Sequence, residues 1–286
     1  MMEDKKVDIS LDKIVDVAND RPNDQKEDYY VDGLRYCGIC GGRKERFIEI
    51  AGVSRKVKCL CPCEDAKWYR DKREAEERER QMEIARLKSR SLMDVRYQGV
   101  LFSDVVVTDE NRNTVELCRR YVDRFDMYLR ENQGLLFYGS VGTGKSYLAA
   151  SIANELLNKG RSVMMTSFVK FFELIAKGRE TEDEVMRSMD NASLLIIDDL
   201  GAERNTGYAL EKVFNVIDNR YRLKKPIIIT TNLEYNEMVM EEDLRYKRIY
   251  DRIFEVCFPV KFTGKSWRML SSVDRAEKMR RLLEED

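Results

Sequence analysis

The stretch Gly139-Ser140-Val141-Gly142-Thr143-Gly144-Lys145-Ser146 decides the fold of this chain. It matches the pattern GxxxxGK(S/T) in full, and it lies between an apolar run and a segment rich in Ala and Leu. Glycines let backbone N–H groups converge on phosphates, the lysine reaches the β- and γ-phosphates, and the serine hydroxyl binds Mg²⁺. The start of the following helix adds a field that favours an anion. The stretch therefore predicts a strand, a phosphate-binding loop and a helix that together bind ATP and Mg²⁺.

Two further apolar segments end in polar residues suited to ATP hydrolysis. Residues 194–199 read LLIIDD, and we expect Asp198 to hold Mg²⁺ through water and Asp199 to polarise the attacking water. Residues 226–232 read PIIITTN, and we expect Asn232 to orient water against the γ-phosphate. With Lys145 on the phosphates, these side chains predict hydrolysis as well as binding.

Three arginines follow the third of these strands. Arg248 and Arg252 are spaced i,i+4 and therefore share one face of a predicted helix. We expect Arg252 to act as a finger on the γ-phosphate of a neighbouring subunit, with Arg248 beside it. Arg268 follows the last predicted strand, where it could contact the phosphates in cis. Hydrolysis would then depend on assembly of the chain into a homo-oligomer.

From about residue 98 the chain alternates β-rich apolar runs with helical patterns. Continuous apolar runs such as residues 194–197 are typical of parallel strands buried on both faces. The fold class is therefore α/β, with a parallel sheet between two layers of helices. The predicted strands are 134–139, 162–167, 193–199, 226–232 and 256–262. The predicted helices are 145–158, 168–177, 208–223 and a broken segment over 234–255.

Five of the seven cysteines lie in a short N-terminal segment. A CxxC pair is followed by the sequence CLCPC, and the chain has no histidine that could serve as a ligand. Two cysteine pairs across a hairpin predict a ribbon-like Zn²⁺ site with four thiolate ligands. Cys37 and Cys40 are two of the predicted ligands. The other two come from Cys59, Cys61 and Cys63, and the spacing leaves open which of these is spare.

Composition sets the wider limits. The chain has 286 residues, a net charge of −1 and 43% hydrophobic residues, enough for a real core and without an overall charge that indicates nucleic acid. The absence of histidine excludes Ser-His-Asp and Cys-His catalysis. We find no signal peptide and no span of about 20 apolar residues, so we expect a soluble cytoplasmic protein without membrane contact. We predict three parts: 1–63 with the zinc module and a short helix near 11–18, a charged linker helix over 64–97, and an ATPase domain over 98–286.

With these residues in hand, the chain resembles the DnaC/IstB-like AAA+ ATPases, which include replicative helicase loaders and transposition helpers. The resemblance covers about residues 97–268 and rests on GSVGTGKSYLAASIAN, LLIIDDLGAER, IIITTNLEYNEM, RIYDRI and GKSWR. It implies a five-stranded sheet in the order 5-1-4-3-2, no full lid domain, and oligomers whose sites are shared between subunits. It also implies contact of Phe168, Lys170 and Phe171 with single-stranded DNA, although the two aromatic rings could instead be core residues.

An N-terminal cysteine module followed by a charged helix resembles the loaders of Gram-positive bacteria and their phages most closely. That resemblance implies an ATP-dependent loader whose N-terminal region engages a hexameric DnaB-type replicative helicase. The alternatives are an IstB-like transposition helper and a zinc adaptor that switches with ATP but does not hydrolyse it. A small-molecule P-loop kinase fits less well, because such enzymes do not need the Thr-Thr-Asn strand and the arginine pair.

Overall fold

The structure is a computed structural model that describes residues 27–50, 52–178, 181–203 and 206–284. The short helix predicted near residues 11–18 lies outside these ranges. Contacts divide the chain into two units, Met1–Gln81 and Met82–Asp286. We describe each unit by itself, and the division into three parts by function stays a prediction.

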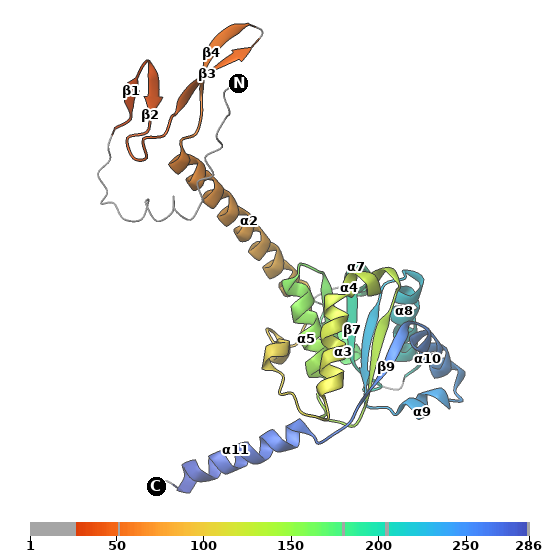
Figure 1. The fold of residues 1–286 in the computed structure, drawn as a ribbon. Coiled ribbons are helices and arrows are strands. Elements are labelled where there is room, and N and C mark those ends of the chain that lie inside the picture. Colours follow the sequence, from red (N-terminus) through yellow and green to blue (C-terminus); the bar gives the residue numbers. More distant parts are fainter. Residues whose placement is uncertain (1–26, 51, 179–180, 204–205, 285–286) are drawn as a thin grey trace. The chain divides into compact units, whose positions relative to one another are not determined.

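The first unit contains two small antiparallel hairpins (Figure 1). One is β1 (Tyr29–Val31) with β2 (Leu34–Tyr36), and the other is β3 (Glu45–Ile50) with β4 (Val53–Lys58). A bridge between Tyr36 and Arg43 joins the end of the first hairpin to the start of the second. Both hairpins are largely exposed, so little apolar surface is buried within this unit.

The charged segment forms the helix α2 (Pro62–Arg90), which starts with proline, a favoured first residue of helices. We predicted that this helix extends to residue 97, but it ends at Arg90. Leu92 has a φ of +53°, a backbone conformation that stops a helix. The Ser91 carbonyl then accepts a hydrogen bond from the Met165 N–H of strand β6 (Val163–Thr166), which lies at one edge of the main sheet.

The second unit is built on a five-stranded parallel sheet with the order β6-β7-β8-β5-β9. Its other strands are β5 (Gly134–Gly139), β7 (Leu194–Leu200), β8 (Ile227–Thr231) and β9 (Cys257–Phe262). Numbered from the phosphate-loop strand and followed from β9, this order is 5-1-4-3-2. The predicted α/β class and strand order are confirmed.

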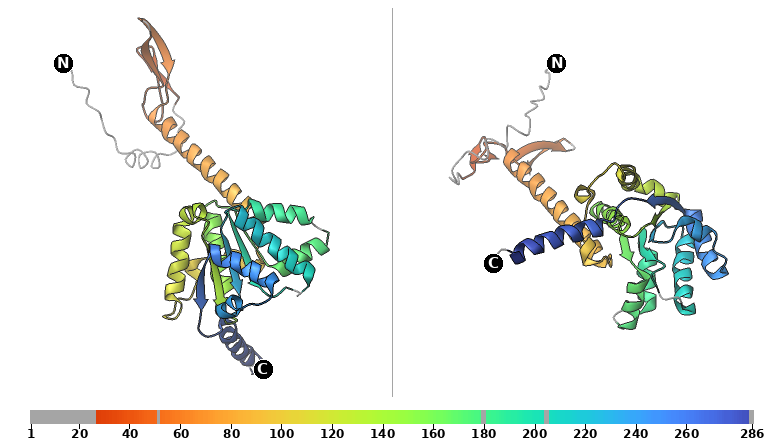
Figure 2. Two further views of the ribbon diagram at one scale, coloured as in Figure 1. Left: turned by 90° about the vertical axis from the view of Figure 1, so that its right-hand side faces the viewer. Right: turned by 90° about the horizontal axis from the view of Figure 1, so that it is seen from below.

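Helices cover both faces of the sheet (Figures 1 and 2). Side chains alternate between the faces, so Leu135 and Phe137 belong to one hydrophobic cluster and Leu136 to the other. The first face packs against α3 (Arg112–Asp123), α4 (Phe125–Arg130) and α5 (Lys145–Asn158). The second packs against α6 (Phe168–Ala176), α7 (Glu182–Asn191), α8 (Gly207–Arg222), α9 (Tyr235–Val239) and α10 (Leu244–Val256).

Three elements remain in the second unit. Two short 3₁₀ turns, η1 (Val95–Tyr97) and η2 (Phe102–Asp104), precede α3, and α11 (Trp267–Glu284) follows the sheet. After β9 the described chain holds one helix, α11. Among the described helices, none is long and apolar enough to cross a membrane.

A buried arginine ties the starts of two central strands together. Arg220 is 1% exposed and donates to the carbonyls of Ala192 at 2.8 Å and Pro226 at 2.7 Å, just before β7 and β8. It also donates to the Met189 carbonyl near the end of α7. Burial lowers its pKa to about 10. One side chain therefore holds the two strands, β7 and β8, whose other ends carry the acidic and Thr-Thr-Asn motifs. This arginine was not identified from the sequence.

Candidate functional site: a nucleotide pocket and a cysteine cluster

The phosphate-binding loop joins β5 to α5. Gly142 has a φ of +83°, and a Cβ there would lie 2.1 Å from the Ser266 hydroxyl, so neither the backbone angle nor the space admits a side chain. Gly144 has a φ of +99° and is the N-cap residue that precedes α5. The Thr143 hydroxyl closes the loop by donating to the Ser140 carbonyl at 2.8 Å. The geometry is that of a loop whose backbone N–H groups can surround phosphate.

Lys145 is buried in the middle of this loop. Its ammonium group donates to the carbonyls of Gly139 and Ser140, each at 2.7 Å, and burial lowers its pKa while Asp199 opposes the shift. A buried cation with carbonyl acceptors alone is poorly compensated, and a phosphate supplies the charge that is lacking. The lysine therefore fits the predicted phosphate contact.

The first turn of α11 is attached to the same loop. The Trp267 N–H donates to the Gly142 carbonyl at 2.9 Å. The charge of the next residue, Arg268, acts on both Lys145 and Asp199. Arg268 is therefore near enough to influence both groups within the same chain, and its contact with the phosphates stays a prediction.

The two acids of β7 and the polar end of β8 meet at the carboxyl edge of the sheet. Asn232 donates through Nδ2 to Asp199 Oδ1 at 2.7 Å, and the Thr230 hydroxyl donates to Asp198 Oδ1 at 2.7 Å. Partial burial, followed by the negative charge of Asp198, raises the pKa of Asp199. Ser146, the other residue predicted to hold Mg²⁺, is the second residue of α5. Asn232 thus holds the predicted base, a contact that the sequence did not suggest.

The predicted finger is held inside its own chain. Arg252 Nε donates to Asp218 Oδ1 at 2.6 Å, and its guanidinium lies over the Phe214 ring with 4.7 Å to the ring centroid. Arg222 binds the other oxygen of the same carboxylate at 2.8 Å. Arg248 is exposed, and its carbonyl accepts from Arg252. The two predicted arginines therefore lie together on α10 but differ in exposure.

The predicted DNA contact needs correction for its aromatic members. Phe168 and Phe171 are 1% and 0% exposed and pack in the cluster beneath α6, so neither ring has a face on which a base could stack. Their i,i+3 spacing, which is visible in the sequence, is typical of residues on the buried face of a helix. Lys170 is half-buried and its ammonium donates to the Leu92 carbonyl.

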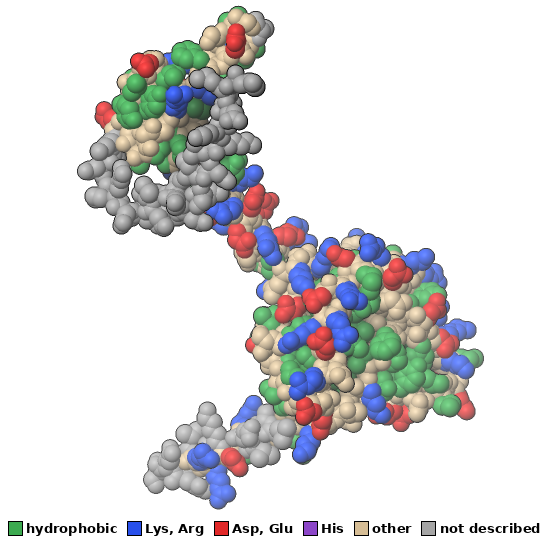
Figure 3. Space-filling model, in the orientation of Figure 1, with side chains coloured by type: hydrophobic (Ala, Val, Ile, Leu, Met, Phe, Trp, Pro, Cys, Tyr) green, Lys and Arg blue, Asp and Glu red, His purple; other side chains and the backbone are tan. Residues whose placement is uncertain are grey.

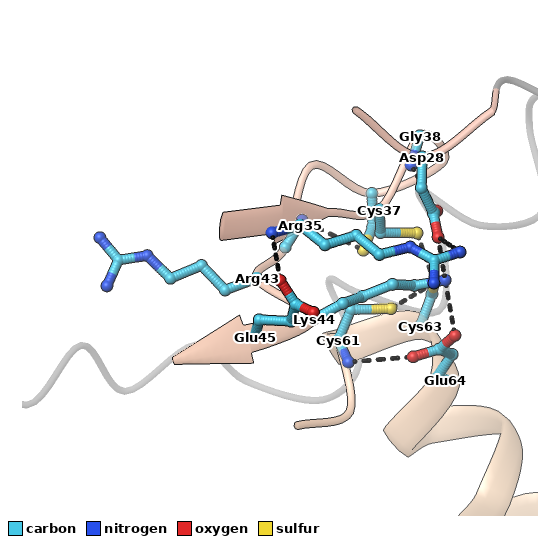
Figure 4. A network of polar contacts seen from close by, with 12 residues as sticks. Asp28, Arg35, Cys37, Gly38, Arg43, Lys44, Glu45, Cys61, Cys63 and Glu64 are labelled. Atoms are coloured by element: carbon cyan, nitrogen blue, oxygen red, sulfur yellow. Dashed lines mark hydrogen bonds and ion pairs between the residues drawn. The ribbon is translucent and has the colours of Figure 1, made fainter. Parts of the chain in front are cut away.

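The cysteine cluster brings together four of the five predicted ligands. The sulfur atoms of Cys37, Cys40, Cys61 and Cys63 all lie within 4.8 Å of one another. Figure 4 shows three of these residues, Cys37, Cys61 and Cys63, close together. A tetrahedron of thiolates around Zn²⁺ places its sulfur atoms about 3.8 Å apart, given a Zn–S bond of about 2.3 Å. Cys59 lies apart and donates to the Arg43 carbonyl. The donor set and spacing fit zinc, and the residue left spare is Cys59.

The thiols of the cluster differ in their ease of ionisation. Burial opposes ionisation of Cys37, but hydrogen bonds from the backbones of Cys40 and Ile39 lower its pKa to about 7. Burial raises the pKa of Cys63 to about 11 and that of Cys61 further still. Four thiolates at this spacing need a cation among them, because their charges repel one another.

One lysine connects the two halves of the cluster (Figure 4). Lys44 binds Asp28 at 3.0 Å and Glu64 at 2.7 Å. Asp28 accepts from the Gly38 N–H in the first cysteine turn, and Glu64 accepts from the Cys61 N–H in the second. This brace could not be predicted from the sequence, because its members come from three distant positions.

Comparisons with known proteins agree with the geometry. Residues 64–274 match the profile of the family described as IstB-like ATP binding protein. The replicative helicase loader DnaC of Escherichia coli K12 is 29% identical over 183 residues, covering 62% of this chain and 72% of that protein. The replicative helicase loader DnaI of Bacillus subtilis is 26% identical over 200 residues, covering 63% and 64%.

Among solved structures, a crystal structure of DnaI has a similar fold, with a TM-score of 0.54 and 24% identity. The similarity covers 63% of this chain and 98% of that one. The family profile spans well over half of the sequence and includes the loop, the acids and the arginines described above. The chain belongs to the IstB-like ATP-binding proteins, the DnaC/IstB-like group of AAA+ ATPases.

Proposed function

We propose that this chain is an ATP-dependent loader that delivers a hexameric DnaB-type replicative helicase to DNA. The observation that carries the proposal is the hydrogen-bonded group of Asp198, Asp199 and Asn232 at one sheet edge, in a chain whose relatives are named replicative helicase loaders. The phosphates of ATP would take over the Lys145 ammonium from the two loop carbonyls. Asp199, held by Asn232, would accept the proton of the attacking water.

Ser146 and Asp198 would hold the Mg²⁺ of the Mg–ATP complex, which neutralises charge on the transferred phosphoryl group. Turnover with and without single-stranded DNA, the proposed DNA partner, tests this part. Lys145→Ala should abolish both nucleotide binding and hydrolysis. If the wild-type chain binds ATP but does not hydrolyse it, the alternative of a zinc adaptor that switches with ATP would be favoured instead.

The arginine finger is proposed to act between subunits, through Arg252. In the single chain Asp218 binds Arg252, so a neighbour's γ-phosphate has to compete with that carboxylate. Arg252→Ala and Lys145→Ala should each be inactive alone, and a mixture should regain turnover, because each supplies the group that the other lacks. A mixture that stays inactive, or an Arg252→Ala chain with full turnover, would refute the finger in trans.

The N-terminal region is proposed to bind the helicase. In Figure 3 hydrophobic side chains are visible on the surface of the first unit. The exposed aromatic residues of this unit include Tyr30, which is 65% exposed, and Phe47, which is 56% exposed. Aromatic side chains of this kind are enriched at the centre of protein interfaces. The zinc module would give them a rigid support without needing a large core.

A pull-down with the tagged full-length chain tests this docking. Wild type should recover the helicase, and Tyr30→Ala with Phe47→Ala should lose it while keeping its zinc and its ATP binding. Tyr208→Ala, which removes an exposed tyrosine from α8, is the matched control. Recovery of a transposase in place of the helicase would favour the transposition helper and refute the loader.

A further inference from the structure

A buried hydroxyl lies between the two acids of the nucleotide site. Thr230, in β8, is 1% exposed. Its Oγ1 donates to Asp198 Oδ1 at 2.7 Å and accepts from the Asp199 N–H at 2.8 Å. One side chain therefore contacts both acids, one through its carboxylate and the other through its backbone.

The backbone at this point has left the regular ladder. The pairing of β7 with β8 shifts register between Ile197 and Leu200, and Asp199 has a φ of +60°, which is disfavoured for a residue with a Cβ. A bulge leaves an N–H without its strand partner, and an unpaired N–H is costly. The hydroxyl of Thr230 supplies the missing acceptor. It thereby stabilises the left-handed conformation that directs the Asp199 side chain toward Asn232.

The second bond of the hydroxyl acts on Asp198. The bond occupies Asp198 Oδ1, so Oδ2 is the oxygen that this bond leaves for Mg²⁺. Groups that orient a metal ligand in this way commonly change metal affinity or activity by about 10- to 100-fold when they are removed. We propose that Thr230 is a positioning residue of the nucleotide site, which presents Asp198 to the Mg²⁺ of Mg–ATP and fixes Asp199 for hydrolysis. This inference rests on the proposed ATPase function.

The neighbouring threonine provides a matched comparison. Thr231 is also fully buried, and its hydroxyl likewise makes two bonds, donating to the Leu200 carbonyl at 2.8 Å and accepting from the Leu233 N–H at 3.2 Å. Both of its partners are backbone groups and neither is an acid. Loss of either hydroxyl removes a comparable pair of buried hydrogen bonds, but only Thr230 orients a carboxylate.

The test measures binding of a fluorescent ATP analogue to the full-length chain over a Mg²⁺ titration, together with ATP turnover and thermal unfolding. Thr230→Val keeps the shape and removes the hydroxyl, and Thr230→Ser restores the hydroxyl. We expect Thr230→Val to weaken the Mg²⁺-dependent gain in nucleotide affinity by about 10- to 100-fold, with affinity in EDTA unchanged. Thr230→Ser should stay within about threefold of wild type, and Thr231→Val should lose thermal stability while its Mg²⁺ titration remains that of wild type.

A Thr230→Val chain with the Mg²⁺ titration of wild type would overturn the inference and leave the ATPase proposal standing. Equal effects of Thr230→Val and Thr231→Val would also overturn it, because a purely structural hydroxyl predicts that result. If the wild-type chain shows neither Mg²⁺-dependent nucleotide binding nor turnover, the proposed ATPase function is refuted, and the inference on Thr230 is refuted with it. Should Thr230→Val not fold, Thr230→Ala removes the same hydroxyl from a smaller side chain and the same outcomes apply.

Discussion

Replacement of Arg220 by methionine should destabilise the second unit by about 2 kcal/mol, the difference between about 4 kcal/mol lost and about 2 kcal/mol regained. The change removes the donors that serve the carbonyls of Ala192 and Pro226 at 2.8 and 2.7 Å. Each buried acceptor left unpaired costs about 1–3 kcal/mol, so the two cost about 2–6 kcal/mol. Against this, Arg220 Nε has no hydrogen-bond partner, and removing that buried group regains about 1–3 kcal/mol.

Urea unfolding of the full-length chain followed by circular dichroism measures the loss, with thermal unfolding as a second measure. For a domain of this size, about 2 kcal/mol lowers Tm by about 4–8 °C. Arg222→Met is the control, because it removes an arginine two positions away that is 73% exposed and whose ion pair contributes at most about 1 kcal/mol. An Arg220→Met chain within 1 kcal/mol of wild type, or an equal loss in both variants, would refute the reasoning.

Three further predictions concern the cysteine cluster and α10. Cys61→Ser should lose the bound zinc, whereas Cys59→Ser should keep one equivalent, as measured by metal analysis of the purified chain; loss of zinc from both would contradict the ligand set. Lys44→Met should release zinc to a chelator faster than wild type, because the two cysteine turns lose their common brace, and an unchanged rate would contradict that role. Hydrogen bonds from the Arg245 side chain and backbone lower the pKa of Asp243 to about 2. The ionised carboxylate therefore stabilises the folded chain fully above the ordinary carboxyl pKa, and this stabilisation is lost as the pH falls from about 4 towards 2. The excess stability of wild type over Asp243→Asn, followed by thermal unfolding, should therefore shrink over that range, and a constant difference would contradict the linkage.

Much of the nucleotide site could be predicted because its signals are local. A phosphate loop needs glycines at fixed offsets, and strands buried on both faces need continuous apolar runs, so β5 and α5 have the bounds predicted for them. The spare cysteine could not be identified, because the choice depends on how the backbone turns between Cys59 and Cys63. Arg220 was missed for a related reason, since its acceptors are carbonyls that only the folded sheet brings together.

Other misses had signals that were available. Helix α7 was not predicted, although Thr181 and Glu184 form a capping box at its start. Phe168 and Phe171 were predicted to contact DNA, but their i,i+3 spacing is that of residues on the buried face of a helix. Aromatic residues near a cation are ambiguous in sequence, because stacking surfaces and core faces share the same composition.

The hydrogen bond from the Trp267 N–H to the Gly142 carbonyl links the first turn of α11 directly to the phosphate loop. Helix α11 has 18 residues and is therefore about 27 Å long, at 1.5 Å per residue. A rotation of about 10° at its anchored first turn would displace its far end by about 5 Å, by simple trigonometry on that length. A small rotation of the first turn, which is bonded to the phosphate loop, would therefore appear as a displacement of several ångströms at the far end of α11.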